Sequence, residues 1–116
     1  MTPITAEQLQ SMQDRNRDLI LINTLSADDF EETKIPGAIN IPQDEEGFVD
    51  QVERRAGGRD KTLVVYCASP ECESSSQAAR KLEKAGFEKV FDFEGGFQAW
   101  QQSQQNAPGH ATAPRR

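Results

Sequence analysis

Cys67 and Cys72 are the residues of this sequence best suited to covalent chemistry, and four residues separate them. A thiol reacts as its thiolate, and a helix N-terminus lowers a cysteine pKa from its ordinary value of ~8.5. If a helix begins just after Cys72, its free N–H groups favour an anion at Cys67, such as a thiolate, a persulfide or a tetrahedral oxyanion. The pattern predicts a reactive Cys67, although a buried cysteine can also be a small apolar core residue.

The second thiol, Cys72, is near enough to Cys67 for a disulfide if the loop bends suitably, although Pro70 stiffens the turn between them. One interpretation is a resolving thiol, which discharges a persulfide on Cys67 or traps a sulfenic acid as a disulfide. The other is a partly exposed thiol without a role. The sequence leaves both open.

Composition excludes several classes of site. A zinc site needs about four ligands, and the chain offers two cysteines and one histidine, His110, so we expect no metal. Asp and Glu outnumber Lys and Arg by 19 to 13, a net charge of −6 that argues against nucleic acid as a partner. The longest apolar run, 63–68, is far shorter than the roughly 20 residues of a membrane span. With no leader-like segment at its start, the chain is expected in the cytoplasm, away from membranes.

The elements around the cysteines predict an α/β fold. The run 61–66 is continuously apolar in its second half, which is typical of a parallel strand covered on both faces. Cys67 follows it directly, and Ser74 with Gln77 fits a capping box for the next helix. Strands alternate with helices, which predicts a parallel sheet with helices on both faces and ligands at the carboxyl ends of its strands. We expect one domain over residues 1–104 and a disordered polar tail over 105–116.

Three motifs resemble the rhodanese-like superfamily of single-domain sulfurtransferases, over about residues 4–102. They are Ile35–Pro42 (IPGAINIP), Val64–Cys67 (VVYC) and Glu94–Trp100 (EGGFQAW). The resemblance implies a three-layer fold with a five-stranded parallel sheet flanked by helices, and no cofactor. It also implies that Cys67 takes a sulfane sulfur from a small-molecule or protein donor, holds it as a persulfide and passes it to a thiol or other nucleophile. The residues implied to bind substrate are those of the cysteine loop: Ala68, Ser69, Pro70, Glu71, Glu73 and Ser74.

Two departures from the family pattern bear on substrate choice. The loop lacks the basic residue that many members use to hold an anionic donor, and Glu71 and Glu73 add negative charge, so we expect thiosulfate to bind poorly. Where the family often has Asp-x-Arg at the end of its second strand, this chain has Asn23-Thr24-Leu25.

Three other functions compete with sulfur transfer. The Cys67/Cys72 pair could serve a redox-responsive regulatory or binding module. Phosphatase or arsenate-reductase chemistry uses a related cysteine loop, but it requires an arginine for the developing oxyanion charge, and this loop has none. Finally, the chain could be an inactive scaffold, because a fold does not guarantee its usual chemistry.

Overall fold

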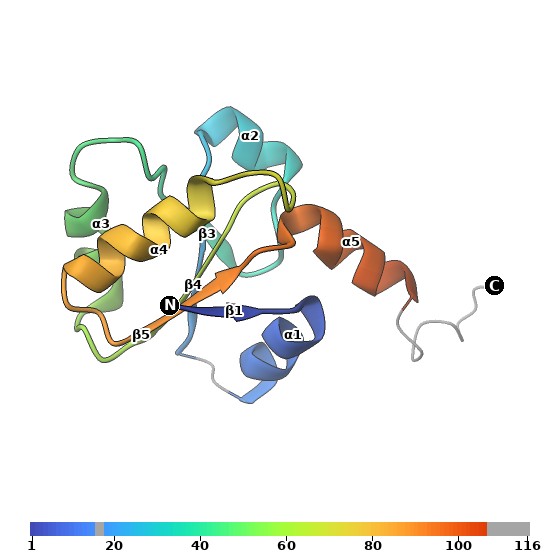
Figure 1. The fold of residues 1–116 in the computed structure, drawn as a ribbon, viewed down its shortest axis with the longest axis horizontal. Helices are drawn as coiled ribbons and strands as arrows, with labels where there is room; N and C mark the ends of the chain where they lie inside the picture. The colour runs from blue at the N-terminus through green and yellow to red at the C-terminus, as the bar shows by residue number, and fades with distance from the viewer. Residues whose placement is uncertain (16–17, 107–116) are drawn as a thin grey trace.

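The computed structural model describes residues 1–15 and 18–106 and contains one five-stranded sheet. All of its strand pairs are parallel, in the order β1-β5-β4-β2-β3. The strands are β1 (Thr2–Ile4), β2 (Ile20–Asn23), β3 (Ala38–Asn40), β4 (Thr62–Tyr66) and β5 (Lys89–Phe93). The helices are α1 (Ala6–Arg15), α2 (Ala27–Glu32), α3 (Phe48–Ala56), α4 (Ser74–Lys84) and α5 (Gly96–Asn106) (Figure 1).

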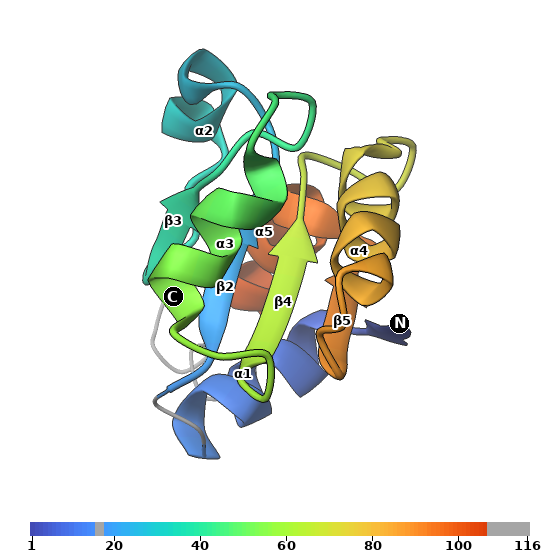
Figure 2. The same cartoon turned by 90° about the vertical axis from the view of Figure 1, so that its left-hand side faces the viewer.

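Helices cover both faces of the sheet, which confirms the predicted three-layer α/β fold. Figure 2 shows α3 and α4 in front of the strands and α1 and α5 behind them. The short helix α2 lies beyond the end of the sheet to which the strands point. The helices on the two faces leave the carboxyl ends of the central strands β4 and β2 open to the loops that follow them.

The central position of β4, with helices on both faces of the sheet, explains why its sequence is continuously apolar. Leu63 and Val65 point into a core shared with α3 and α4, whereas Val64 and Tyr66 point into a second core shared with α1 and α5. All four are fully buried, as expected of a parallel strand covered on both sides. β4 therefore holds the backbone just before Cys67 rigidly in the middle of the molecule.

The first strand, β1, has only three residues and no apolar run that would mark it in the sequence. β1 pairs with β5 at the sheet edge, with Thr2 opposite Phe91 and Ile4 opposite Phe93. It contains Pro3, and an edge strand tolerates proline because one side of its backbone needs no ladder hydrogen bonds. The five strands implied by the family resemblance are confirmed.

At the other end of the chain, α5 continues through Gln105 and Asn106, two residues beyond the expected domain boundary at 104. The remainder of the predicted disordered tail, with His110, lies outside the described residues. Among the described residues, no helix combines the length and the apolar character that crossing a bilayer requires.

Candidate functional site

The cysteine loop begins at the carboxyl end of β4, where the sequence places it. Cys67 is buried with 1% of its surface exposed, and Cys72 is half-buried. The two sulfurs form a disulfide, with their Cα atoms 6.4 Å apart. A turn in which the Cys72 N–H donates to the Ser69 carbonyl (3.1 Å) brings Cys72 back over Cys67. The loop therefore bends enough for the disulfide despite Pro70.

The loop leads straight into the N-terminus of α4, but the predicted capping box of Ser74 and Gln77 is wrong. Glu73 occupies the N-cap position, no side chain caps the helix there, and Ser74 is the first helical residue. The Ser74 hydroxyl donates instead to the carbonyl of Thr24 (3.1 Å), and Thr24 Oγ1 lies 3.0 Å from Ser74 Oγ. The first-turn N–H groups of α4 are thus left without a side-chain acceptor, and such groups favour an anion.

The Gly95-Gly96 turn supports the loop from the opposite side. The N–H groups of Phe97 and Gln98, in the first turn of α5, donate to the carbonyls of Cys67 and Ala68, both at 2.9 Å. A Cβ at Gly96 would meet this same backbone, 2.9 Å from the carbonyl carbon of Ala68, and the φ of Gly96 is +65°. The glycine is required here for the close approach of two backbones and for its left-handed conformation.

The end of β2 adjoins the cysteine loop and holds it in register. The Thr24 N–H donates to the Tyr66 carbonyl (3.1 Å), next to Cys67. Asn23, which stands where the family often has aspartate, accepts from the Leu25 N–H (2.9 Å) and donates to Thr33 Oγ1 (3.0 Å). Asn23 therefore makes the hydrogen bonds of a strand-end side chain without carrying a charge.

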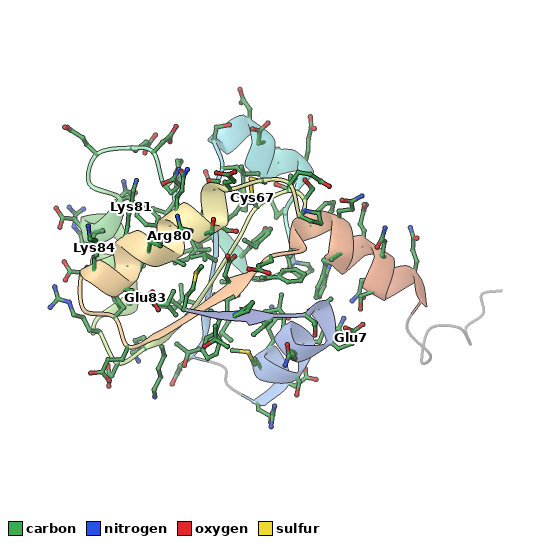
Figure 3. All side chains as sticks on the ribbon, viewed as in Figure 1. Glu7, Cys67, Arg80, Lys81, Glu83 and Lys84 are labelled. Atoms are coloured by element: carbon green, nitrogen blue, oxygen red, sulfur yellow. A yellow bond between two sulfur atoms is a disulfide. The ribbon has the colours of Figure 1, made fainter. Side chains whose placement is uncertain are left out.

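The loop surface is acidic. Glu71 and Glu73 are exposed, Pro70 is exposed at the tip, and Ala68 and Ser69 are half-buried beside Cys67. The residues 67–74 contain no lysine or arginine. Figure 3 shows Cys67 near the N-terminal end of α4 and Arg80 further along that helix. The loop itself therefore presents two carboxylates and no cation to an anionic donor.

Two buried side chains, Ser75 and Asp92, belong to this site although the sequence analysis did not identify them. Ser75 Oγ lies 3.8 Å from Cys67 Sγ. Asp92, on β5, is 1% exposed, and its burial raises the pKa of its carboxyl. The available signal was an aspartate inside the apolar strand 90–93, where a charge is costly. Nothing in the local sequence marked Ser75 out from the serines beside it.

A second shifted group, Tyr66, sits just before Cys67 and fastens β4 to the segment before β3. Its hydroxyl donates to the Thr33 carbonyl (2.8 Å) and accepts from the Ile35 N–H (3.1 Å). Burial raises the pKa of this phenol, more than its hydrogen bonds with Asn23 and Ile35 lower it. Tyr66 is therefore a neutral structural anchor beneath the loop.

Comparison with known proteins supports one family. Residues 5–103 match the sequence model of the rhodanese-like domain. The chain is 32% identical over 97 residues to the thiosulfate sulfurtransferase GlpE of Pseudomonas syringae pv. syringae, covering 84% of both chains. It is 28% identical over 97 residues to the putative sulfur carrier protein YrkF of Bacillus subtilis; this covers 84% of the chain but only 49% of that relative, about half its length.

A solved structure agrees with these sequence relatives. The rhodanese-like domain of the Alr3790 protein from Anabaena sp. superimposes with a TM-score of 0.73 at 26% identity, covering 88% of this chain and 74% of that one.

Proposed function

Because the chain belongs to the rhodanese-like domain family, we propose that it is a sulfurtransferase in which Cys67 carries the sulfur as a persulfide. Relatives named as a thiosulfate sulfurtransferase and a putative sulfur carrier support the reaction class. The observation that carries the proposal is the position of Cys67. It lies at the carboxyl end of β4, in a loop leading to the uncapped N-terminus of α4.

The proposed reaction has two exchange steps and no net oxidation. The Cys67 thiolate attacks the outer sulfur of a donor persulfide, R–S–SH. A bond forms between Cys67 Sγ and that sulfur, the donor S–S bond breaks, and R–S⁻ leaves with the electron pair. An acceptor thiolate R′–S⁻ then attacks the outer sulfur of Cys67–S–SH, which yields R′–S–SH and regenerates the Cys67 thiolate. The partners are therefore a persulfide donor, small molecule or protein, and a thiol or similar nucleophile.

The α4 N-terminus supports this cycle because its N–H groups favour a negative sulfur over a neutral one. The close contact with α5 supports it too, since two hydrogen bonds hold the Cys67 and Ala68 carbonyls against α5. A loop held in this way keeps its own N–H groups oriented without reorganisation during the reaction.

Sulfur loading tests the proposal directly. The reduced protein is exposed to a low-charge organic persulfide, and mass spectrometry locates any added sulfur atom. We expect one sulfur on Cys67 in the wild type and in Cys72→Ser, and none in Cys67→Ser. Loading on Cys72 alone, or no loading with any donor, would overturn the proposal and leave the inactive scaffold.

The acidic loop determines the expected donor. Thiosulfate is a dianion, and it must approach past Glu71 and Glu73. The double change Glu71→Gln/Glu73→Gln should improve thiosulfate use, and more at low salt, because screening acts over ~10 Å at 0.1 M salt. The matched control, Asp14→Asn/Glu88→Gln, removes two exposed charges from the last turn of α1 and from the residue before β5. Equal thiosulfate kinetics in both double variants would show that loop charge does not select the donor.

The disulfide favours a second candidate, a redox-responsive module. In the resolving reaction, Cys67–S–S⁻ and Cys72–SH give the Cys67–Cys72 disulfide and HS⁻. The Cys72 proton leaves with the released sulfur. If Cys72 resolves the persulfide, Cys72→Ser should keep its added sulfur far longer than the wild type does, without acceptor. Identical decay in the two proteins would exclude the resolving role.

A further inference from the structure

Asp92 is a buried carboxyl that the proposed sulfur transfer does not yet use. It lies one residue from the end of β5, with Val65 of β4 and Pro3 of β1 as its neighbours in the sheet register. Neither of these neighbours titrates. Both carboxyl oxygens are buried, and no hydrogen-bond partner reaches them within residues 1–15 and 18–106. An unpartnered buried carboxyl is costly, so its retention calls for an explanation from the site around it.

The side chain of Asp92 lines a cavity of about 470 Å³ beneath the cysteine loop. Cys72 and Glu73 contribute to this cavity from the loop and its junction with α4, Ser75 from the first turn of α4, and Glu94 from the position just after β5. Ser75 links the two groups: it lines the same cavity as Asp92, and its Oγ is 3.8 Å from Cys67 Sγ.

The surroundings of Asp92 shift the pKa of its carboxyl in opposite directions. Burial raises the pKa of its carboxyl most strongly, and the negative charge of Glu94 raises it further. The interaction with Ser75 and the positive charge of Arg80 lower it, but by less. Glu73, across the cavity, is exposed. The net effect is a raised pKa. The protonated acid can donate a hydrogen bond, whereas a carboxylate can only accept one.

We propose that Asp92 is a positioning residue that acts on Cys67 through Ser75. In the disulfide form no partner from the described part of the chain reaches the carboxyl oxygens. In the reduced protein the carboxylic acid donates its proton in a hydrogen bond to Ser75 Oγ, and this directs the Ser75 hydroxyl proton toward Cys67 Sγ. The hydroxyl then stabilises the thiolate before sulfur loading and the persulfide anion after it. No covalent bond changes in this arrangement. The proposal rests on the proposed sulfur-transfer function of Cys67. It adds that Asp92, on β5, tunes the reactivity of that cysteine.

The arrangement has two states with opposite hydrogen-bond directions. When Asp92 loses its proton, the carboxylate accepts the Ser75 hydroxyl proton, and the hydroxyl turns away from Cys67. The thiolate then loses one donor. Raising the pH through the titration of Asp92 should therefore remove part of the stabilisation of the Cys67 thiolate.

The test measures the alkylation rate of Cys67 against pH in a Cys72→Ser background, where no disulfide forms and no second thiol competes for the reagent. Asp92→Leu removes the donor and should slow alkylation about tenfold below the thiol pKa, the effect of losing one hydrogen bond to an ionised group. Asp92→Asn keeps a donor, because its amide N–H can replace the acid, and should restore the rate. Asp14→Asn, an exposed aspartate in the last turn of α1, is the matched control and should change nothing.

The pH profile distinguishes positioning from a purely structural effect. The ratio of the parent rate to the Asp92→Asn rate should fall as the pH rises, since only the parent loses its donor. In a Ser75→Ala background, Asp92→Asn and Asp92→Leu should react alike, because the link to Cys67 is gone. A ratio independent of pH, or a difference between the Asp92 variants that persists without Ser75, would overturn the inference.

This outcome is separate from the fate of the proposed function. If Cys67→Ser abolishes sulfur loading while the Asp92 variants behave like Asp14→Asn, sulfur transfer stands and the positioning role fails. If no variant accepts sulfur but the alkylation profiles differ as expected, the positioning role stands and the transfer function fails.

Discussion

Replacing Gly96 by alanine should disturb the cysteine loop without touching either sulfur. The φ of Gly96 is +65°, and an added Cβ would lie 2.9 Å from the Ala68 carbonyl carbon and 2.9 Å from the Ser69 nitrogen, with the Cys67 carbonyl oxygen nearer still. All of these atoms are backbone, so α5 and the loop must move apart. The hydrogen bonds from Phe97 and Gln98 to the loop then lengthen.

The expected loss in the free energy of unfolding has two separate sources. A left-handed residue with a Cβ costs about 1 kcal/mol, and forcing an extra methyl group into a packed contact costs about 1–3 kcal/mol. Gly96→Ala should therefore lower the free energy of unfolding by about 2–4 kcal/mol. A domain of this kind has about 5–15 kcal/mol of stability, so the variant should still fold.

Gly57→Ala is the matched control for this experiment. Gly57 is also left-handed, with a φ of +78°, but a Cβ there meets nothing within 4 Å. It should therefore show only the first cost, about 1 kcal/mol. Urea unfolding gives the stability difference between the two variants, and Cys67 alkylation and sulfur loading report the loop. If Gly96→Ala matches Gly57→Ala in stability and the wild type in Cys67 reactivity, α5 does not hold the loop in place.

Three further predictions concern buried groups near the site. Burial raises the pKa of Asp92 in the folded protein. Its contribution to the free energy of unfolding is therefore most favourable below the unfolded pKa of ~3.9, and it is lost as the pH rises through the folded pKa. Asp92→Asn should therefore gain stability over the wild type at neutral pH in urea unfolding, and a gain that does not shrink toward pH ~4 would contradict this. Tyr66→Phe should cost about 1–3 kcal/mol by leaving two backbone groups unpaired; an unchanged unfolding midpoint would be inconsistent with this anchor. An external thiol should attack the disulfide at the half-buried Cys72 rather than at Cys67, releasing the Cys67 thiolate, and peptide mapping of a mixed disulfide on Cys67 would refute this.

The local sequence is sufficient to predict features that depend only on residues adjacent in the chain. The apolar run of β4 predicted a buried parallel strand, and Leu63 to Tyr66 are fully buried between two cores. Gly96, in the sequence motif Glu94–Trp100, meets the loop backbone in a left-handed conformation. The residue types are informative at these positions because burial on both faces and a left-handed φ each restrict which residues fit.

The positions of Cys67 and Cys72 along the chain were also determined by sequence, together with the absence of a cation between them. That spacing permits a disulfide but does not require one. Its formation depends on the turn from Ser69 to Cys72, a conformation that the loop sequence alone left open.

Only the tertiary structure decided which side chains surround the cysteine. Ser74 was expected to cap its own helix, but its hydroxyl donates instead to the carbonyl of Thr24, 50 residues away in the chain. Asp92 comes to the same cavity as Cys72 because β5 lies beside β4 and α4 begins above both. These contacts join distant segments, and their partners depend on strand order and helix placement. The local sequence of each segment specifies its own conformation but not its neighbours in space, so Ser75 and Asp92 became visible only in the folded chain.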